Sequence, residues 1–256
     1  MRLLTLALIV AGLSQQPSQP AVPDLSCADV GAALRAVVRN DVRLRDWADL
    51  SRYRDANRAV PQPAAGSRRV VFMGDSITDN WQQPQFGGFF PGRDYLDRGI
   101  SGQTTPQMLV RFRADALDLK PAAVVILAGT NDIAGNTGPM TDDEIEGNLA
   151  SMAELARAHG LKVVLASITP TSAYHTSARG IPQTTQRPLA RIKEINDWIK
   201  RYASEYGDVY LDYFSAMVDD KGQMRADFTL DDLHPTAAGY AIMAPLAEKA
   251  IERALR

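Results

Sequence analysis

The sequence predicts an α/β fold in which a parallel sheet carries helices on both faces. Short, nearly continuous apolar runs alternate with segments of helical periodicity, and a polar loop follows each run. Such runs are typical of strands that are buried on both faces. Parallel strands need crossover connections, and the helical segments between the runs supply them.

Strands are predicted at residues 70–73, 122–127, 162–167 and 209–212, with a weaker fifth strand at 95–100. Helices are predicted at 105–119, 142–159, 188–206 and 235–255. Functional side chains of such sheets gather at the carboxyl ends of the strands. The loops that follow the strands are therefore where a site is expected.

Three regions are predicted along the chain: a signal peptide and linker at 1–23, a helical extension at 24–66 and the main domain at 67–256. Arg2 precedes an uncharged run at 3–13, which is about the length of a secretory signal core and too short to span a bilayer. A buried core helix is the alternative interpretation of this run. Export to the periplasm or the extracellular space, after cleavage of the signal, is the expectation.

The extension is expected to form one or two amphipathic helices between Cys27 and Val60. Apolar residues recur there at steps of three and four, with Arg and Asp between them. Pro61 and Pro63 end this pattern. The sequence leaves open whether these helices pack on the domain or bind a partner.

Charge and composition exclude several classes of protein. The 256 residues carry 28 Lys and Arg against 30 Asp and Glu, which argues against a nucleic-acid partner. With 45% hydrophobic and 23% charged residues, the chain can build a packed core. Cys27 is the single cysteine, and no His or Cys cluster has ligand spacing, so neither a metal nor a cofactor is expected. No stable membrane span is expected, and the oligomeric state is left open.

Ser76 is the predicted nucleophile. It follows the first strand in Gly74-Asp75-Ser76, where the glycine allows a tight turn and the hydroxyl reaches the edge of the sheet. A serine at this place can equally be the N-cap of a helix. The motif alone is therefore weak evidence.

His234 is the predicted general base. The spacing in Asp231-Asp232-Leu233-His234 lets the Asp231 carboxylate hydrogen-bond the ring and stabilise its charged form. Of the other two histidines, His159 lies at a predicted helix C-terminus and is interpreted as structural. His175 lies in a loop, either solvated or in contact with substrate.

Two further strand ends offer hydrogen-bond donors for an oxyanion. Asn131, in Gly129-Thr130-Asn131-Asp132, can donate from its amide, and Gly102 can donate from its backbone N–H. With the N–H of Ser76, three donors would converge. Each residue alone has a turn as its alternative role.

These blocks together resemble the SGNH hydrolases, also called GDSL esterases and lipases, from about residue 68 to residue 255. The resemblance implies a three-layer α/β/α, flavodoxin-like sandwich with a central parallel five-stranded sheet. It also implies Ser76 as nucleophile, His234 as base, Asp231 as its orienting partner, and an oxyanion hole of Ser76, Gly102 and Asn131. The stretch 89–105 is similar to the lysophospholipase L1-like and platelet-activating-factor acetylhydrolase-like branch.

The expected function is therefore a serine esterase that hydrolyses carboxylic esters through an acyl-enzyme. The polar loop at 169–187 favours short-chain or acetyl esters, carbohydrate O-acetyl groups among them, over lysophospholipids or thioesters. Asp75, Trp81, Phe90 and His175 are the predicted substrate contacts, although the aromatic residues could instead pack beneath their loop. A non-catalytic carbohydrate-binding module, a flavodoxin-like cofactor binder and an acyltransferase remain as rival functions.

Overall fold

The structure is a computed structural model that describes residues 26–175 and 180–256. The predicted signal peptide at 1–23 lies outside the described residues. The chain divides into two compact units, Met1–Val42 and Arg43–Arg256. The division predicted after residue 66 stays a prediction.

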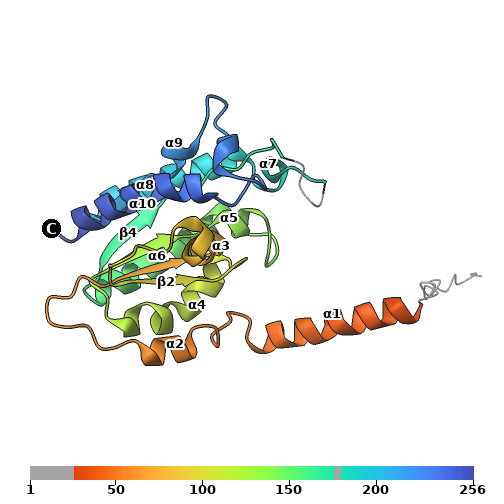
Figure 1. Cartoon of the computed structure of the whole chain (residues 1–256), viewed down its shortest axis with the longest axis horizontal. Coiled ribbons are helices and arrows are strands. Elements are labelled where there is room, and N and C mark those ends of the chain that lie inside the picture. Colours follow the sequence, from red (N-terminus) through yellow and green to blue (C-terminus); the bar gives the residue numbers. More distant parts are fainter. Residues whose placement is uncertain (1–25, 176–179) are drawn as a thin grey trace, which may run out of the picture. The chain divides into compact units, whose positions relative to one another are not determined.

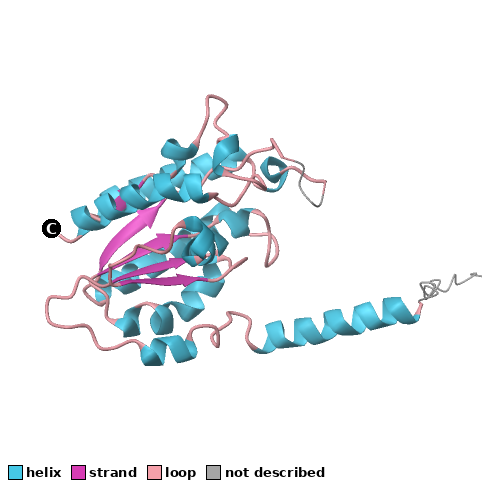
Figure 2. Ribbon diagram, in the orientation of Figure 1, coloured by secondary structure: helices cyan, strands magenta, loops and turns pink. Residues whose placement is uncertain are grey.

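A five-stranded parallel sheet forms the centre of the second unit, with strand order β2-β1-β3-β4-β5. The arrows visible in Figure 2 point in the same direction. The strands are β1 Val70–Gly74, β2 Tyr95–Gly99, β3 Ala123–Leu127, β4 Lys162–Ala166 and β5 Val209–Leu211. This sheet confirms the predicted fold class, including the weaker strand at 95–100.

Both faces of the sheet are covered, as the continuous apolar runs predict. One face packs on α4 (Thr105–Asp115), α6 (Asp142–Ala158) and α8 (Leu189–Tyr206). The other face packs on α10 (Ala237–Ala254). Alternate residues of β1 enter the two cores: Val71 and Met73 on one side, Val70 and Phe72 on the other. Figure 1 shows α10 and α4 on opposite sides of the strands.

Local signals fix where these helices begin and end. Thr141 caps α6 in a capping box with Glu144, which satisfies two backbone N–H groups at the helix start. Gly207 ends α8 in the left-handed conformation that glycine adopts without strain. The helix predicted at 105–119 is shorter in the structure, because α4 ends at Asp115 and a separate turn, η3, spans Leu117–Leu119.

Short elements connect the main ones and form most of the edge where the strands end. They are α3 (Ser76–Asp79), η1 (Asn80–Gln82), η2 (Pro84–Phe86), α5 (Thr130–Ile133), α7 (Gln183–Gln186), α9 (Phe214–Met217) and η4 (Ala226–Phe228). In Figure 1, α3 and α5 lie at the ends of the strands. The residues predicted to carry chemistry lie in these elements and in the adjacent loops.

The predicted extension contains two helices, α1 (Cys27–Arg45) and α2 (Arg54–Ala59). At the start of α1, the backbone N–H and the hydroxyl of Ser26 both donate to the Asp29 carboxylate. The backbone N–H of Asp29 donates in return to the Ser26 hydroxyl oxygen. Within the second unit, Tyr53 precedes α2 and its hydroxyl donates to the carbonyl of Gly99 at the end of β2. Across the described ranges of the chain, no helix has the length and apolar character needed to cross a membrane.

Candidate active site

Ser76 begins α3 immediately after β1. Asp75 caps this helix, because its side chain accepts a hydrogen bond from the N–H of Ile77 at 2.9 Å. The buried hydroxyl of Tyr240 donates to the Ile77 carbonyl at 2.8 Å and so ties α3 to α10. The sharp exit from the strand thus holds the Ser76 hydroxyl at the carboxyl edge of the sheet.

His234 lies between Ser76 and Asp231. Its Nε2 is 2.9 Å from the Ser76 Oγ, and its Nδ1 is 2.6 Å from Asp231 Oδ2. The other carboxylate oxygen of Asp231 accepts the backbone N–H groups of His234, at 2.8 Å, and Leu233, at 3.1 Å. Because the carboxylate is bonded to both ring and backbone, it sets the orientation of the imidazole. A proton on Nδ1 leaves Nε2 free to accept the proton of the serine hydroxyl.

The environment of Asp231 favours its charged form. Partial burial alone would raise the pKa of this carboxyl, but the hydrogen bonds from the His234 ring and backbone outweigh that effect. The pKa of Asp231 consequently lies well below its usual range. A carboxylate that stays ionised can stabilise the imidazolium when His234 takes up a proton.

Gly102 and Asn131 line the same cleft as Ser76; Gly102 lies in the loop after β2, and Asn131 lies in α5, after β3. Gly102 has a φ of +81°, a left-handed conformation suited to glycine. The Asn136 amide donates to the Gly102 carbonyl at 3.0 Å, and Asp79 accepts both the N–H and the hydroxyl of Ser101. These bonds fix the Gly102 loop between α3 and the end of α5.

The Asn131 side chain is buried and oriented. Its Nδ2 donates to the backbone carbonyl of Gln103 at 3.0 Å. An amide nitrogen carries two hydrogens, so the second remains for a group in the cleft. The side chain of Gln103 is held at both ends. Its Oε1 accepts a hydrogen bond from the Nε of Arg111, and its Nε2 donates to the carbonyl of Ala48 at 2.7 Å.

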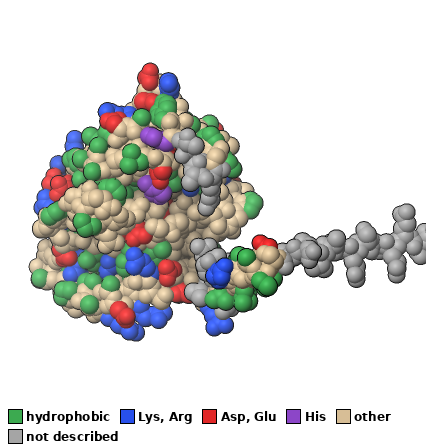
Figure 3. Space-filling model, turned by 45° about the vertical axis from the view of Figure 1, so that its right-hand side comes forward, with side chains coloured by type: hydrophobic (Ala, Val, Ile, Leu, Met, Phe, Trp, Pro, Cys, Tyr) green, Lys and Arg blue, Asp and Glu red, His purple; other side chains and the backbone are tan. Residues whose placement is uncertain are grey.

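These residues line one cleft of about 550 Å³. Its lining residues are Ser76, Asn80, Ser101, Gly102, Asn131, Asn136, Gln183, Gln186, Arg187, Asp231, Leu233 and His234. Leu233 is the single large apolar side chain among them. On the face drawn in Figure 3, hydrophobic side chains are interspersed with charged and other polar groups. Most of the side chains that line the cleft around Ser76 are polar or charged in type.

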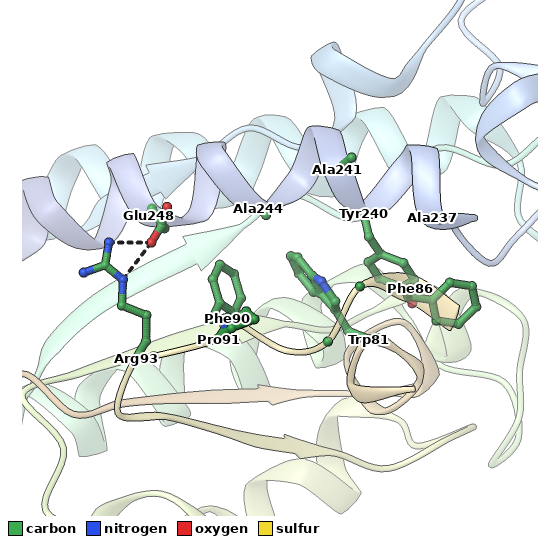
Figure 4. A pocket seen from close by; sticks show the side chains of 13 residues that line it. Trp81, Phe86, Phe90, Pro91, Arg93, Ala237, Tyr240, Ala241, Ala244 and Glu248 are labelled. Carbon is green, nitrogen blue, oxygen red and sulfur yellow. Dashed lines mark hydrogen bonds and ion pairs between the residues drawn. The ribbon is translucent and has the colours of Figure 1, made fainter. Parts of the chain in front are cut away.

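All four predicted substrate contacts lie outside the lining of this cleft. Trp81 and Phe90 are buried in an aromatic cluster with Phe72, Phe89 and Tyr240. Figure 4 shows Trp81 and Phe90 beneath α10, in a separate pocket that ends at the Arg93–Glu248 ion pair. Asp75 is also buried, and burial raises its pKa to about 6. The aromatic residues therefore pack beneath their loop, which was the alternative interpretation.

His175 is held by a second carboxylate, next to the one that holds His234. Its Nδ1 is 3.0 Å from Asp232 Oδ1, and Asp232 also accepts the Ser172 hydroxyl and the backbone N–H of Tyr174. Asp232 is completely buried and has a φ of +67°, which is strained for a residue other than glycine. His175 is thus part of a loop anchor and does not line the cleft.

Sequence reasoning did not identify Asp79, Asn136 or Arg187, which support the site. Asp79 and Asn136 hold the loop of Gly102, whereas Arg187 contacts Asn131. No spacing pattern marks them, because they come from α3 and from two loops that meet only in the folded chain. His159, by contrast, lies at the C-terminus of α6 with its Nδ1 at 2.8 Å from the Leu155 carbonyl, away from the cleft.

Comparison with known proteins identifies related chains. A GDSL-like lipase from Bacteroides thetaiotaomicron VPI-5482 is 42% identical, with a TM-score of 0.74 over 81% of this chain and 99% of that one. Esterase TesA from Pseudomonas aeruginosa is 46% identical over 79 residues, which are 30% of this chain and 38% of TesA. The uncharacterized lipoprotein YqeF from Bacillus subtilis is 39% identical over 80 residues, which are 30% of this chain and 33% of YqeF. The matched region thus spans about a third of these two curated relatives.

The model of the GDSL-like lipase/acylhydrolase family matches residues 72–242, which is more than half of the chain. This region extends from β1 into α10 and contains every residue that lines the cleft. The resemblance of the motifs to the GDSL family is thereby confirmed. The chain belongs to the GDSL-like lipase/acylhydrolase family, a family of ester hydrolases.

Proposed function

We propose that the protein hydrolyses carboxylic esters with a Ser-His-Asp triad, through a covalent acyl-enzyme. The observation that carries this proposal is the hydrogen-bonded chain from the Ser76 hydroxyl through His234 to Asp231. It lies in a cleft that Gly102 and Asn131 also line. A nucleophile, an oriented base and oxyanion donors at one point are what acyl transfer requires.

The reaction has two halves. His234 Nε2 takes the proton of Ser76 as Oγ attacks the ester carbonyl, and the oxyanion receives hydrogen bonds from Ser76 N–H, Gly102 N–H and the Asn131 amide. The tetrahedral intermediate collapses, and His234 returns the proton to the departing alcohol. Water, deprotonated by His234, then attacks the acyl-enzyme, and the acid leaves as Oγ recovers its proton.

We propose short acyl groups on a polar alcohol as the substrate class, with carbohydrate acetyl esters as the leading example. Side-chain amides surround the nucleophile, from Asn80, Asn136, Gln183 and Gln186. Amides both donate and accept hydrogen bonds, which suits hydroxyl-rich groups. Leu233 is the single large apolar side chain in the lining, which leaves a long acyl chain few aliphatic side chains to pack against. A lysophospholipase or thioesterase would need a larger apolar wall.

Hydrolysis of p-nitrophenyl acetate, butyrate and octanoate by the purified protein tests both parts of the proposal. Ser76→Ala should abolish turnover while the fold is retained. Ser151→Ala is the matched control, because this hydroxyl donates to the Gly147 carbonyl within α6 and does not line the cleft. Acetate should be the best substrate and octanoate the poorest.

Turnover that persists in Ser76→Ala would refute the triad, and a folded protein without turnover would favour the carbohydrate-binding module. A preference for octanoate would overturn the short-acyl assignment in favour of a lipid acylhydrolase. Product analysis with an acceptor sugar present separates hydrolysis from acyl transfer. Release of free acetate alone is the result expected for a hydrolase.

We propose in addition that the protein is exported. The positive charge and short apolar run at residues 2–13 support this proposal, and the relative YqeF is described as a lipoprotein. Expression of the full chain and of a chain without residues 1–23 tests it. The full chain should appear outside the cytoplasm, and the shortened chain should stay inside.

A further inference from the structure

The Asn131 amide is held at both of its ends. Nδ2 donates to the Gln103 carbonyl at 3.0 Å, and Oδ1 lies 3.4 Å from the Nη2 of Arg187. A flipped amide would set its oxygen against the Gln103 carbonyl and its NH₂ group against a guanidinium, which has no acceptor. The two contacts therefore select the one orientation that leaves an N–H for the cleft.

Arg187 is itself anchored by hydrogen bonds to Thr130, the neighbour of Asn131 in α5, and to Gln183 in α7. Its Nε donates to the carbonyl of Thr130 at 3.0 Å and to the Thr130 hydroxyl at 3.1 Å. Its Nη1 donates to the Gln183 side chain, and its backbone N–H donates to the Gln183 carbonyl at 2.8 Å. The residue is 5% exposed, so this guanidinium is part of the wall behind the oxyanion donors.

We propose that Arg187 is a positioning residue for the oxyanion hole, an inference that rests on the proposed ester hydrolysis. Its guanidinium fixes the orientation of the Asn131 amide and polarises that amide through the hydrogen bond to Oδ1. Electron withdrawal at the amide oxygen makes the Nδ2 hydrogens better donors. The gain is largest in the transition state, when the carbonyl oxygen of the ester becomes negative.

The geometry of the side chain explains why arginine occupies this position. One planar guanidinium reaches Thr130, Gln183 and Asn131 with three different nitrogens. A lysine ammonium is a compact point charge that cannot span these partners in the same way. Arg187→Lys would keep the charge and lose the fork. The lysine variant therefore separates the effect of charge from that of orientation.

The test compares Arg187→Met and Arg187→Lys with wild type on p-nitrophenyl acetate. Arg187→Met should lower kcat by about 10-fold or more and change KM by less than about 2-fold, because the contact acts on the transition state. Arg187→Lys should recover part of kcat. Arg191→Met is the matched control, since Arg191 has equally directed bonds to Asp142 and Met140 but does not line the cleft.

A double-mutant cycle with Asn131→Ala shows whether Arg187 acts through the amide. In the Asn131→Ala background, Arg187→Met should cost less than about 2-fold in kcat, because the amide it orients is gone. A merely structural role would instead lower the melting temperature and give the same loss of kcat in both backgrounds. Should Arg187→Met fail to fold, the same cycle is run with Arg187→Lys.

The outcomes separate this inference from the proposed function. If wild type is active, Ser76→Ala is inactive and Arg187→Met matches wild type, the positioning role is overturned and ester hydrolysis stands. An equal loss in both backgrounds also overturns it. If folded wild type shows no turnover, both proposals fail together. A loss of kcat that disappears in the Asn131→Ala background supports the inference.

Discussion

At the scale of single residues, the geometry of the cleft depends on side chains whose polar atoms are already hydrogen-bonded to neighbouring residues. The His234 ring is bonded on both nitrogens, and the Asn131 amide is bonded at both ends. Groups held in this way need little reorganisation when charge develops in the transition state. The rate should therefore respond strongly to the loss of one donor.

Asn131→Ala should lower kcat for p-nitrophenyl acetate by about 10²- to 10³-fold, the usual cost of one oxyanion donor. KM should change little, because the lost hydrogen bond strengthens only as the oxyanion forms. Steady-state kinetics with the purified variant measure both constants, and circular dichroism checks the fold. A loss confined to KM would mean that Asn131 binds the ground state and is not an oxyanion donor.

At the scale of elements, the position of α3 depends on how closely it approaches β2. A Cβ on Gly99, the last residue of β2, would lie 2.1 Å from the backbone nitrogen of Asp79 and 2.8 Å from the carbonyl oxygen of Asp75. Both contacts are with backbone atoms of the turn and helix that contain Ser76. A side chain at this position must therefore displace α3 and, with it, Ser76.

Gly99→Ala should reduce both stability and kcat, because α3 moves away from the sheet to relieve the clash. Gly147→Ala is the control: Gly147 lies in α6 with no atom within 4 Å of its added Cβ. It should gain about 0.5–1 kcal/mol, since alanine favours the helix interior. Urea denaturation and the esterase assay give the two readouts. Wild-type activity in Gly99→Ala would show that the contact between α3 and β2 does not set the Ser76 geometry.

At the scale of the whole molecule, buried acids link stability to pH. Burial raises the pKa of Asp97 to about 7 against the opposing hydrogen bond from the Gly99 N–H. Within the described residues its other carboxylate oxygen has no hydrogen-bond partner. The folded protein thus keeps a proton that the unfolded chain releases from about pH 4. The free energy of unfolding should fall as the pH rises from about 4 to 7.

Asp97→Asn should remove this contribution, because asparagine does not ionise. Relative to wild type, the variant should become more stable as the pH rises from about 4 to 7, with no further gain above the pKa of Asp97. Urea midpoints at several pH values give the difference. Asp118→Asn, an exposed position in η3, is the control for charge removal at the surface. A difference between Asp97→Asn and wild type that is constant with pH would contradict the linkage.

Apolar periodicity was enough to predict the α/β class, the five strands and the main helices, because this periodicity reports burial and burial dominates these elements. The sequence also singled out Ser76, His234, Asp231, Gly102 and Asn131, because motifs at strand ends converge on one edge of a parallel sheet. The ends of the helices were predicted less accurately: the helix predicted to run to residue 119 ends at Asp115.

Which side chains meet across the cleft could not be predicted from local sequence patterns, because the partners lie far apart in the chain. Arg187 reaches Asn131 from 56 residues away along the chain, and the Asp232 anchor holds His175 at a separation of 57 residues. The tertiary structure also decided that Trp81 and Phe90 pack in the core while amides line the cleft. Local pattern reports whether a side chain is buried, whereas its partner depends on loops whose paths are set by packing against the rest of the fold.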